Sequence, residues 1–174
     1  MKRRLIALAA ILALLALPVP APADNPRSAR ADLVDTKGKQ IGTASLTETD
    51  HGVTIVVRVT GLPPGPHAIH IHEAAKCEPP DFATAGGHFN PHGKKHGLKN
   101  PAGPHAGDLP NLTVGPDGTA TAEMTAHGVT LTPGKKESLP GRTSLVIHAG
   151  PDDDLTDPAG NSGARIACGV IEAK

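Results

Sequence analysis

Short runs in which apolar and polar residues alternate follow one another along most of the chain and predict β-strands. In Val53–Val59 every second residue is Val or Ile, so these side chains share one face of a strand. Comparable runs, bounded by turn-forming residues, occupy 31–36, 41–48, 67–72, 109–114, 119–125, 144–148 and 165–171. We find no sustained helical periodicity and no internal repeat. The pattern therefore predicts an all-β sandwich or barrel of eight strands.

Turn signals support this division, and one long segment lies outside it. Lys37-Gly38-Lys39 separates the first two runs, and Gly115-Pro-Asp-Gly118 separates two later ones. Between residues 72 and 109 the alternation stops, and the chain is rich in Gly and Pro. A loop of this length needs something other than an apolar core to order it.

The start of the chain has the three parts of a secretory signal peptide. Basic residues at 2–4 precede an apolar run over 5–17, and Ala21-Pro22-Ala23 is a small-residue cleavage site. The apolar run is too short to span a membrane comfortably. A second Ala-x-Ala at 29–31 leaves the exact cleavage position open.

We accordingly expect a signal peptide at 1–23, a flexible lead-in at 24–31 and one domain at 32–174, in a periplasmic or secreted protein. Removing the three basic leader residues leaves 14 basic and 17 acidic residues, a net charge of −3. This balance argues against a nucleic-acid partner, and we expect no membrane partner either. The two phenylalanines are the only aromatic residues apart from histidine, so the core must consist of Val, Ile, Leu and Ala.

Histidines are concentrated between residues 67 and 108, which hold seven of the ten in the chain. His70 and His72 lie two apart in a predicted strand, so both rings leave the same face, while Ile69 and Ile71 face a core. Imidazole is a common ligand of zinc and copper. This spacing therefore indicates a metal site at the edge of the predicted barrel.

A second group of candidate ligands lies in the predicted long loop. It comprises three histidines and one carboxylate, His88, His96, His105 and Asp108. Such a set can close a tetrahedral Zn²⁺ site. The alternative is a histidine-rich solvated loop that binds no metal.

Two stretches resemble the copper/zinc superoxide dismutase family. The run from His67-Ala-Ile-His70-Ile-His72-Glu73 through Gly86-Gly-His88-Phe-Asn-Pro91 to His105-Ala-Gly-Asp108 is similar to its metal-binding core. The run Gly160-Asn-Ser-Gly-Ala-Arg-Ile-Ala-Cys-Gly-Val-Ile171 is similar to its second signature. The resemblance covers the chain from about residue 31 and implies an eight-stranded flattened Greek-key β-barrel with long metal-binding and electrostatic loops. It also implies dismutation of superoxide to dioxygen and hydrogen peroxide.

The resemblance assigns ligands to two metals. It implies that copper, which cycles between Cu(II) and Cu(I), is bound by His70, His72, His88 and His148. It implies that structural zinc is bound by His88, His96, His105 and Asp108. His88 belongs to both sets because both nitrogens of a fully deprotonated imidazole can coordinate. On reduction of copper, the His88 bridge is expected to open and take up a proton.

The resemblance also gives roles to residues that bind no metal. Asp152 takes the position of a carboxylate that hydrogen-bonds ligand rings of both metals, although Asp153 and Asp154 beside it permit an acidic solvated loop instead. Arg165 takes the position of the residue that attracts and orients superoxide, the alternative being a surface strand residue. The family pairs Cys77 with Cys168, as the even cysteine count behind a secretory signal also suggests.

Two other functions are compatible with the sequence, and the chain departs from the family pattern at one place. A secreted store of copper or zinc would need no anion-guiding arginine, and a zinc-only structural homologue would lack a copper ligand. The segment between His148 and Arg165 has no lysine, although many members steer superoxide with lysines there. Steering would then rest on Arg165 with basic residues elsewhere, such as Lys94, Lys95 and Lys99.

The other histidines are not expected to be ligands. We expect His67 to bond backbone, and His51 and His127 to lie on the surface. His92 lies inside the predicted zinc loop and could disturb metal loading. The chain has no Trp or Tyr, whereas some periplasmic members of the family dimerise through aromatic side chains. We therefore expect either a monomer or a homodimer with a different interface.

Overall fold

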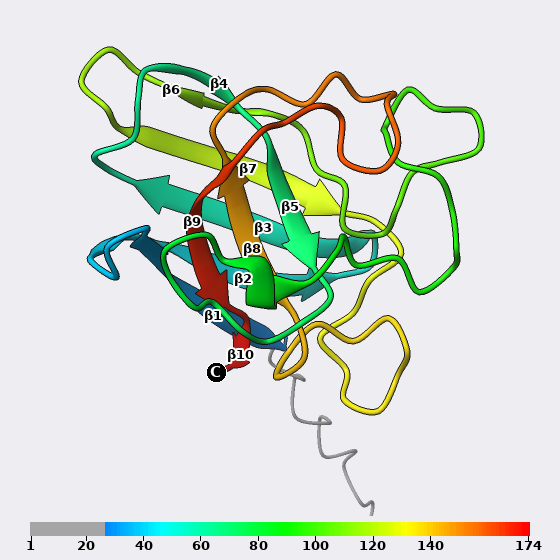
Figure 1. Cartoon of the computed structure of the whole chain (residues 1–174). Coiled ribbons are helices and arrows are strands. Elements are labelled where there is room, and N and C mark those ends of the chain that lie inside the picture. The colour runs from blue at the N-terminus through cyan, green and yellow to red at the C-terminus, as the bar shows by residue number, and fades with distance from the viewer. Residues whose placement is uncertain (1–26) are drawn as a thin grey trace, which may run out of the picture.

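The computed structural model of the protein describes residues 27–174, and within them the chain is all-β (Figure 1). The predicted signal peptide and residues 24–26 of the lead-in lie outside the described residues. The elements are β1 (Ser28–Asp35), β2 (Gln40–Thr49), β3 (Gly52–Val59), β4 (Gly65–His67), β5 (Ile69–His72), the 3₁₀ turn η1 (Ala83–Ala85), β6 (Leu112–Val114), β7 (Ala120–Ala126), β8 (Ser144–His148), β9 (Arg165–Val170) and β10 (Glu172–Ala173). None of the described residues forms a helix with the length and apolar character needed to cross a membrane.

The strands form a curled antiparallel sheet that a smaller pair completes. The eight-stranded sheet runs β5-β8-β9-β1-β2-β3-β7, with β10 added on β1, and β4 pairs with β6 separately. Only Ala68 separates β4 from β5, and β6 packs beside β7 after a tight turn. The β4–β6 pair therefore bridges the two ends of the large sheet, and the strands enclose one core (Figure 1).

Two connections skip neighbouring strands, which is the mark of a Greek key. The chain passes from β3 to β4 without entering the places of β6 and β7, and later from β7 to β8 past β6, β4 and β5. The predicted Greek-key barrel is thus confirmed. One predicted strand, 67–72, is divided at Ala68, whose N–H donates to Gly150 O and whose carbonyl accepts from His148 N.

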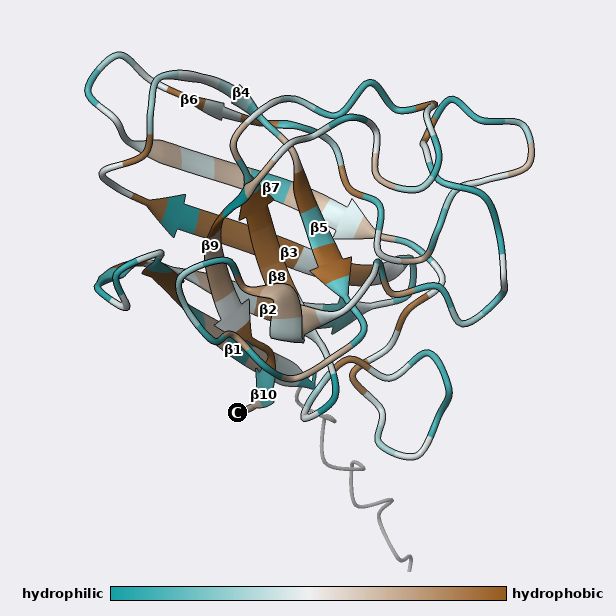
Figure 2. Ribbon diagram, in the orientation of Figure 1, coloured by the Kyte–Doolittle hydropathy of each residue, from teal (hydrophilic) through white to brown (hydrophobic). Residues whose placement is uncertain are grey.

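The core has the composition that the alternation predicts. Val53, Ile55, Val57 and Val59 are all buried on the inner face of β3. Figure 2 shows β3 and β8 (Ser144–His148) as mostly apolar, while the loops are mostly polar. Phe82 lies outside this core, in a small second cluster with Ala85, Val146 and Cys168.

Two long loops, 73–111 and 149–164, extend from the barrel and are fastened to it and to each other. The disulfide Cys77–Cys168 joins the first loop to β9, which confirms the expected pairing. Lys95 Nζ lies 2.8 Å from Asp157 Oδ2, and Lys99 Nζ lies 2.8 Å from Asp154 Oδ2. These ion pairs hold the two loops side by side (Figure 1).

Candidate metal centre

Four imidazoles converge between β5, β8 and the first loop. His70 and His72 project from the same face of β5, as their spacing predicts, and His148 ends the neighbouring strand β8. His88 joins them through a bridge between its backbone and that of His72. One nitrogen from each of the four rings lies within 4.8 Å of the others, and all four residues are buried.

Each of these rings has one buried nitrogen without a hydrogen-bond partner. The atoms are His70 Nδ1, His72 Nε2, His88 Nε2 and His148 Nε2. A buried polar atom without a partner is costly, so four of them facing one point indicate a missing common partner. A tetragonal set of imidazole nitrogens is suited to Cu(II). The residues present therefore fit a copper ion.

In three of these rings, a hydrogen bond from one nitrogen fixes the proton there and leaves the lone pair of the opposite nitrogen free. His72 Nδ1 lies 3.0 Å from Gly86 O, and His148 Nδ1 lies 3.2 Å from Gly163 O. A carbonyl accepts only from N–H, so the proton sits on Nδ1 and the lone pair on Nε2. His70 is reversed, because its Nε2 faces Asp152 and its Nδ1 is free.

A second convergence surrounds Asp108 Oδ1. His88 Nδ1 and His96 Nδ1 each lie 3.0 Å from this oxygen, and His105 Nδ1 lies 3.4 Å from it and 3.4 Å from His88 Nδ1. A tetrahedral Zn²⁺ site with bonds of about 2.0–2.1 Å has edges of about 3.3 Å. Three nitrogens and one oxygen at this spacing fit a zinc ion.

By distance alone, His70 rather than His105 belongs with His88, His96 and Asp108, because one ligand atom from each of these four lies within 4.8 Å of the others. Hydrogen bonding favours His105. Both nitrogens of His70 are already used, since Nε2 bonds Asp152 and Nδ1 belongs to the four-imidazole group. The geometry thus brings together all seven residues that the sequence suggested as ligands.

The backbone of one residue, Ile71, fixes both ends of the segment that carries the second group. Ile71 N donates to Gly107 O, and Ile71 O accepts from Phe89 N. Gly107 N in turn donates to Phe89 O. His88 and Asp108 each lie next to one of these bonded residues, so both are held against β5 by main-chain hydrogen bonds.

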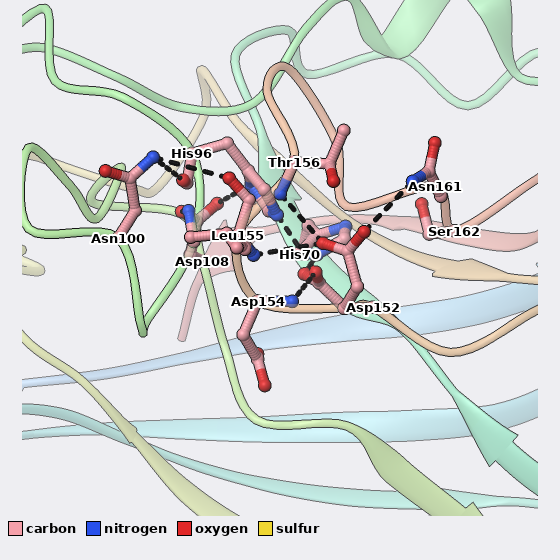
Figure 3. A network of polar contacts seen from close by, with 12 residues as sticks. His70, His96, Asn100, Asp108, Asp152, Asp154, Leu155, Thr156, Asn161 and Ser162 are labelled. Carbon is pink, nitrogen blue, oxygen red and sulfur yellow. Dashed lines mark hydrogen bonds and ion pairs between the residues drawn. The ribbon is translucent and has the colours of Figure 1, made fainter.

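Asp152 connects the two groups (Figure 3). Its Oδ2 lies 2.6 Å from His70 Nε2, and its Oδ1 lies 3.0 Å from His96 Nε2. The alternative of a solvated acidic loop therefore does not describe this buried residue, although it describes the exposed Asp153. Asp153 accepts from the backbone N–H of residues 155 and 156, and Asp154 pairs with Lys99.

Two residues that support Asp152 were not found by sequence reasoning. Asn111 accepts from Asp152 N and donates to Asp152 O, at 2.8 and 2.9 Å. Gly160 has φ +63, and a Cβ there would lie 1.8 Å from Asp152 Oδ1. Gly160 begins the second motif, so its place in that motif was the available signal. Asn111 gave none.

Burial and charge give the two groups opposite electrostatic character. Burial lowers the pKa of His70 to about 4 and that of His148 to about 3, so these rings are neutral near pH 7 with free lone pairs. Burial would also lower the pKa of His96, but hydrogen bonds to Asp108 and Asp152 outweigh it and raise that pKa to about 10. The His96 ring is therefore protonated near pH 7 and paired with two carboxylates, unlike the neutral rings of the first group.

Arg165 lies at the start of β9, beside the four-imidazole group. Its Nη1 donates to Phe82 O and its Nη2 to Gly86 O, both at 2.6 Å. Gly86 O also accepts from His72 Nδ1, which places the guanidinium next to that ring. Arg165 lines a cleft of about 720 Å³, so its charge faces the inside of that cleft.

The basic residues suggested for steering lie elsewhere. Lys95 and Lys99 are paired with Asp157 and Asp154, which offsets their charge. Within the described part of the chain, no lysine lines the cleft, whereas Asp81 does. The suggestion that these two lysines steer an anion is therefore not supported by their contacts.

The remaining histidines behave as expected. His67 Nδ1 lies 2.8 Å from His148 O, and its Nε2 lies 2.8 Å from Pro63 O, which confirms backbone bonding. His51 and His127 are exposed, and His127 Nδ1 bonds His51 O. His92 Nε2 lies 3.5 Å from Glu137 and belongs to neither group.

Comparison with known proteins identifies similar sequences and folds. Residues 40–171 match the family model described as copper/zinc superoxide dismutase (SODC). A Cu-Zn superoxide dismutase of Aquifex aeolicus is 55% identical over 146 residues, which are 82% of this chain and 85% of that protein. A Cu-Zn superoxide dismutase of Caulobacter vibrioides is 44% identical over 149 residues, covering 83% and 86%.

Two solved structures have the same fold. A histidine-for-proline mutant of a SOD-like protein from Bacillus subtilis superposes with a TM-score of 0.80 at 44% identity, covering 82% of this chain and 97% of that one. A Cu/Zn superoxide dismutase from Brucella abortus gives a TM-score of 0.69 at 32% identity, covering 83% and 99%.

Proposed function

Because this chain belongs to the copper/zinc superoxide dismutase family, we propose that its copper is bound by His70, His72, His88 and His148. The family's activity is dismutation of superoxide, an oxidoreductase reaction with copper and zinc as cofactors. When bound, copper supplies the one-electron chemistry by alternating between Cu(II) and Cu(I), so that superoxide yields dioxygen and hydrogen peroxide. The observation that carries the ligand assignment is the convergence of four buried nitrogens without partners.

Zinc is assigned to His88, His96, His105 and Asp108, and its role is structural. Each of the three Nδ1 atoms lies 3.0–3.4 Å from Asp108 Oδ1, close to the edge length of a tetrahedral site, and the carboxylate supplies negative charge. Asp108 Oδ2 also accepts from the backbone N–H of Gly97 and His105, which ties the loop to the same carboxylate. Zinc at this point would join segments that have little apolar core of their own.

His88 is the proton-handling residue in this assignment. Its Nδ1 faces Asp108 and His105, and its Nε2 faces the other three copper-group imidazoles. With both metals bound, Nε2 would take up and return a proton during turnover, while Nδ1 would stay with the zinc group. His70, His72 and His148 need no such change, because a hydrogen bond to the other nitrogen fixes each ring.

Arg165 attracts superoxide and orients it. Superoxide is a small anion with little surface, so its binding comes mainly from charge and hydrogen bonds. The guanidinium is held by two carbonyls and opens onto the cleft beside His72. Asp81 lines the same cleft with opposite charge, so Arg165 has to supply the attraction without help from lysines there.

A periplasmic or secreted location and a monomeric or homodimeric state complete the proposal. The disulfide favours an oxidising compartment, and the relatives named above are bacterial. A light-scattering mass would distinguish monomer from dimer. Fractionation of the expressing cells would test the location.

Charge reversal at Arg165 is the sharpest test of the enzyme assignment. Arg165→Glu should lower the second-order rate with superoxide at least about tenfold, the low end of steering effects, and Arg165→Gln should fall between this variant and wild type. The rate is measured by pulse radiolysis over a range of salt, and copper and zinc contents are measured in the same samples. Arg58→Glu is the matched control, because Arg58 is exposed on β3, outside the cleft.

The salt dependence and the metal contents separate the outcomes. The wild-type rate should fall as salt rises, and the Glu variant should lose or reverse that fall. Full activity of both Arg165 variants at low salt would make Arg165 an ordinary surface residue. Copper-loaded wild-type protein without dismutation would indicate a copper store, and protein that binds zinc but no copper would indicate a structural homologue.

A further inference from the structure

Phe82 is a bulky residue in a backbone conformation that such residues rarely adopt. Its φ is 53° and its ψ is 27°, in the left-handed region, at the start of η1. Left-handed conformations are uncommon for residues other than glycine, and for large side chains they mark strain that the surroundings must maintain. An outlier of this kind points to a local requirement at Phe82 beyond space filling.

The ring of Phe82 is anchored in a buried apolar cluster. It is fully buried and packs with Ala85, Val146 and Cys168, with Val34 and Cys77 at the edge. We call these residues the Phe82 cluster. The cluster is separate from the main core and lies against the disulfide and strands β8 and β9. Moving the ring out of it would expose a large apolar surface.

The backbone of Phe82 performs a specific task at this point. Its carbonyl accepts a hydrogen bond from Arg165 Nη1 at 2.6 Å, and also one from Ala85 N at 3.0 Å. The second acceptor of the guanidinium, Gly86 O, lies at the other end of the same turn. One short turn, 82–86, thus carries both carbonyls that hold Arg165.

The two ends of this turn are fixed by different contacts. At Gly86, φ is +75, and a Cβ would lie 2.8 Å from the side chain of Glu73, so the backbone passes close to that residue. At the other end the Phe82 ring enters the buried cluster, and the backbone N–H of Phe82 donates to Glu78 O at 3.1 Å. Cys77 is bonded to β9 five residues earlier, so the disulfide fixes the loop but not the carbonyl of residue 82.

We infer that Phe82 is a positioning residue for Arg165, because its buried ring keeps the 82–86 turn in the conformation that directs two carbonyls at the guanidinium. This inference rests on the proposed role of Arg165 in attracting superoxide. Arginine has five N–H donors, and the two carbonyls engage two of them. The fixed guanidinium therefore keeps donors available for a small anion in the cleft.

Substitutions at Phe82 should separate this role from simple packing. Phe82→Ala removes the ring and should lower the second-order rate with superoxide roughly three- to tenfold without changing metal content. The affinity of azide for the copper-loaded protein, followed by absorbance, should fall by a similar factor. Phe82→Leu, which stays apolar and unbranched at Cβ, should keep most of the activity. Val34→Ala is the control, because Val34 borders the same cluster but supplies neither of the two carbonyls that accept from Arg165.

A double-mutant cycle shows whether Phe82 acts through Arg165. In the Arg165→Gln background, Phe82→Ala should cost less than about a factor of 1.5, because the guanidinium it positions is absent. Two losses that multiply independently would overturn the inference. If Phe82→Ala does not fold, Phe82→Val replaces it, since a β-branched residue strongly disfavours the left-handed conformation while remaining apolar. Equal rates for the Val and Leu variants would then overturn the inference.

A measurement on copper-free protein separates this inference from the proposed function. In zinc-loaded wild type, the Arg165 Nη protons should give resolved, slowly exchanging NMR signals, and Phe82→Ala should broaden them or speed their exchange. Unchanged Arg165 signals in Phe82→Ala would refute the positioning role whatever the enzyme does. Changed signals in a protein without dismutase activity would leave the positioning role standing and remove its proposed purpose.

Discussion

Replacing Asp152 by asparagine should weaken the copper site more than the zinc site, although the carboxylate contacts a ring from each. Asparagine has nearly the same shape but offers one acceptor oxygen and one NH₂ donor in place of two acceptors. The backbone decides how the amide is oriented. Asp154 N donates to Asp152 Oδ1 at 2.7 Å, so the amide oxygen should remain at that position and still accept from His96. The NH₂ group then faces His70 Nε2.

The size of the effect follows from this contact. His70 Nε2 lies 2.6 Å from Asp152 Oδ2, and in the variant two donors would meet there. Loss of a hydrogen bond to a charged group costs about 1.5–3 kcal/mol, and loss of the partner of a ligating histidine typically costs about 10–100-fold in metal affinity. The alternative tautomer of His70 carries the proton on Nδ1, the nitrogen assigned to copper. Copper affinity should therefore fall about 10–100-fold, and zinc affinity by less.

Chelator competition titrations of both metals provide the measurement, with Asp153→Asn as the control. Asp153 is the adjacent exposed carboxylate, and it bonds backbone N–H groups and Asn161 rather than a histidine ring. A larger loss of zinc affinity than of copper affinity would refute the claim that the N–H of Asp154 fixes the orientation of the amide. Unchanged affinities for both metals would show that the carboxylate does not fix the rings.

Three further results are expected. Removing zinc should increase hydrogen exchange in residues 90–106 more than in the strands, and equal protection with and without zinc would contradict a structural role for the metal. His148→Ala should lose copper and keep zinc in metal analysis, and the opposite result would show that the two sites are exchanged. Metal-free protein should lose stability as pH falls from about 6.5 towards 4, by up to about 4.1 kcal/mol per pH unit, because His70, His72 and His148 have pKa values of about 4, 2 and 3 when folded and bind protons mainly on unfolding. Below about pH 5.5 His96, with its folded pKa raised to about 10, is protonated in both states, so a urea midpoint independent of pH there would contradict the assignment of three neutral buried rings.

The sequence predicts the strands and the ligand types well because both depend on local spacing. Period-two alternation places Val53 and Ile55 inside the barrel, and the same period places His70 and His72 on one face. The division at Ala68 was not predictable in this way. It arises because Ala68 bonds to residues 148 and 150, which follow it by about eighty positions.

The supporting contacts could not be predicted for the same reason. Asn111 holds Asp152, Phe82 holds Arg165, and Lys95 pairs with Asp157, and each pair joins segments far apart in sequence. No local pattern distinguishes Asn111 from a solvated strand-end asparagine. The left-handed conformation of Phe82 contradicts the local preference of its residue type, so it becomes visible only in the fold.

The main-chain bonds of Ile71 affect how the protein acquires its metals. Closing a loop costs entropy, and the main-chain bonds from Ile71 to Phe89 and Gly107 close the segment between them through the backbone rather than through the ligand side chains. That cost belongs to folding, not to metal capture. His88 and Asp108 are positioned by these backbone bonds, which lowers the loop-closure cost that remains for zinc binding. Folding of the barrel can therefore precede uptake of the metals.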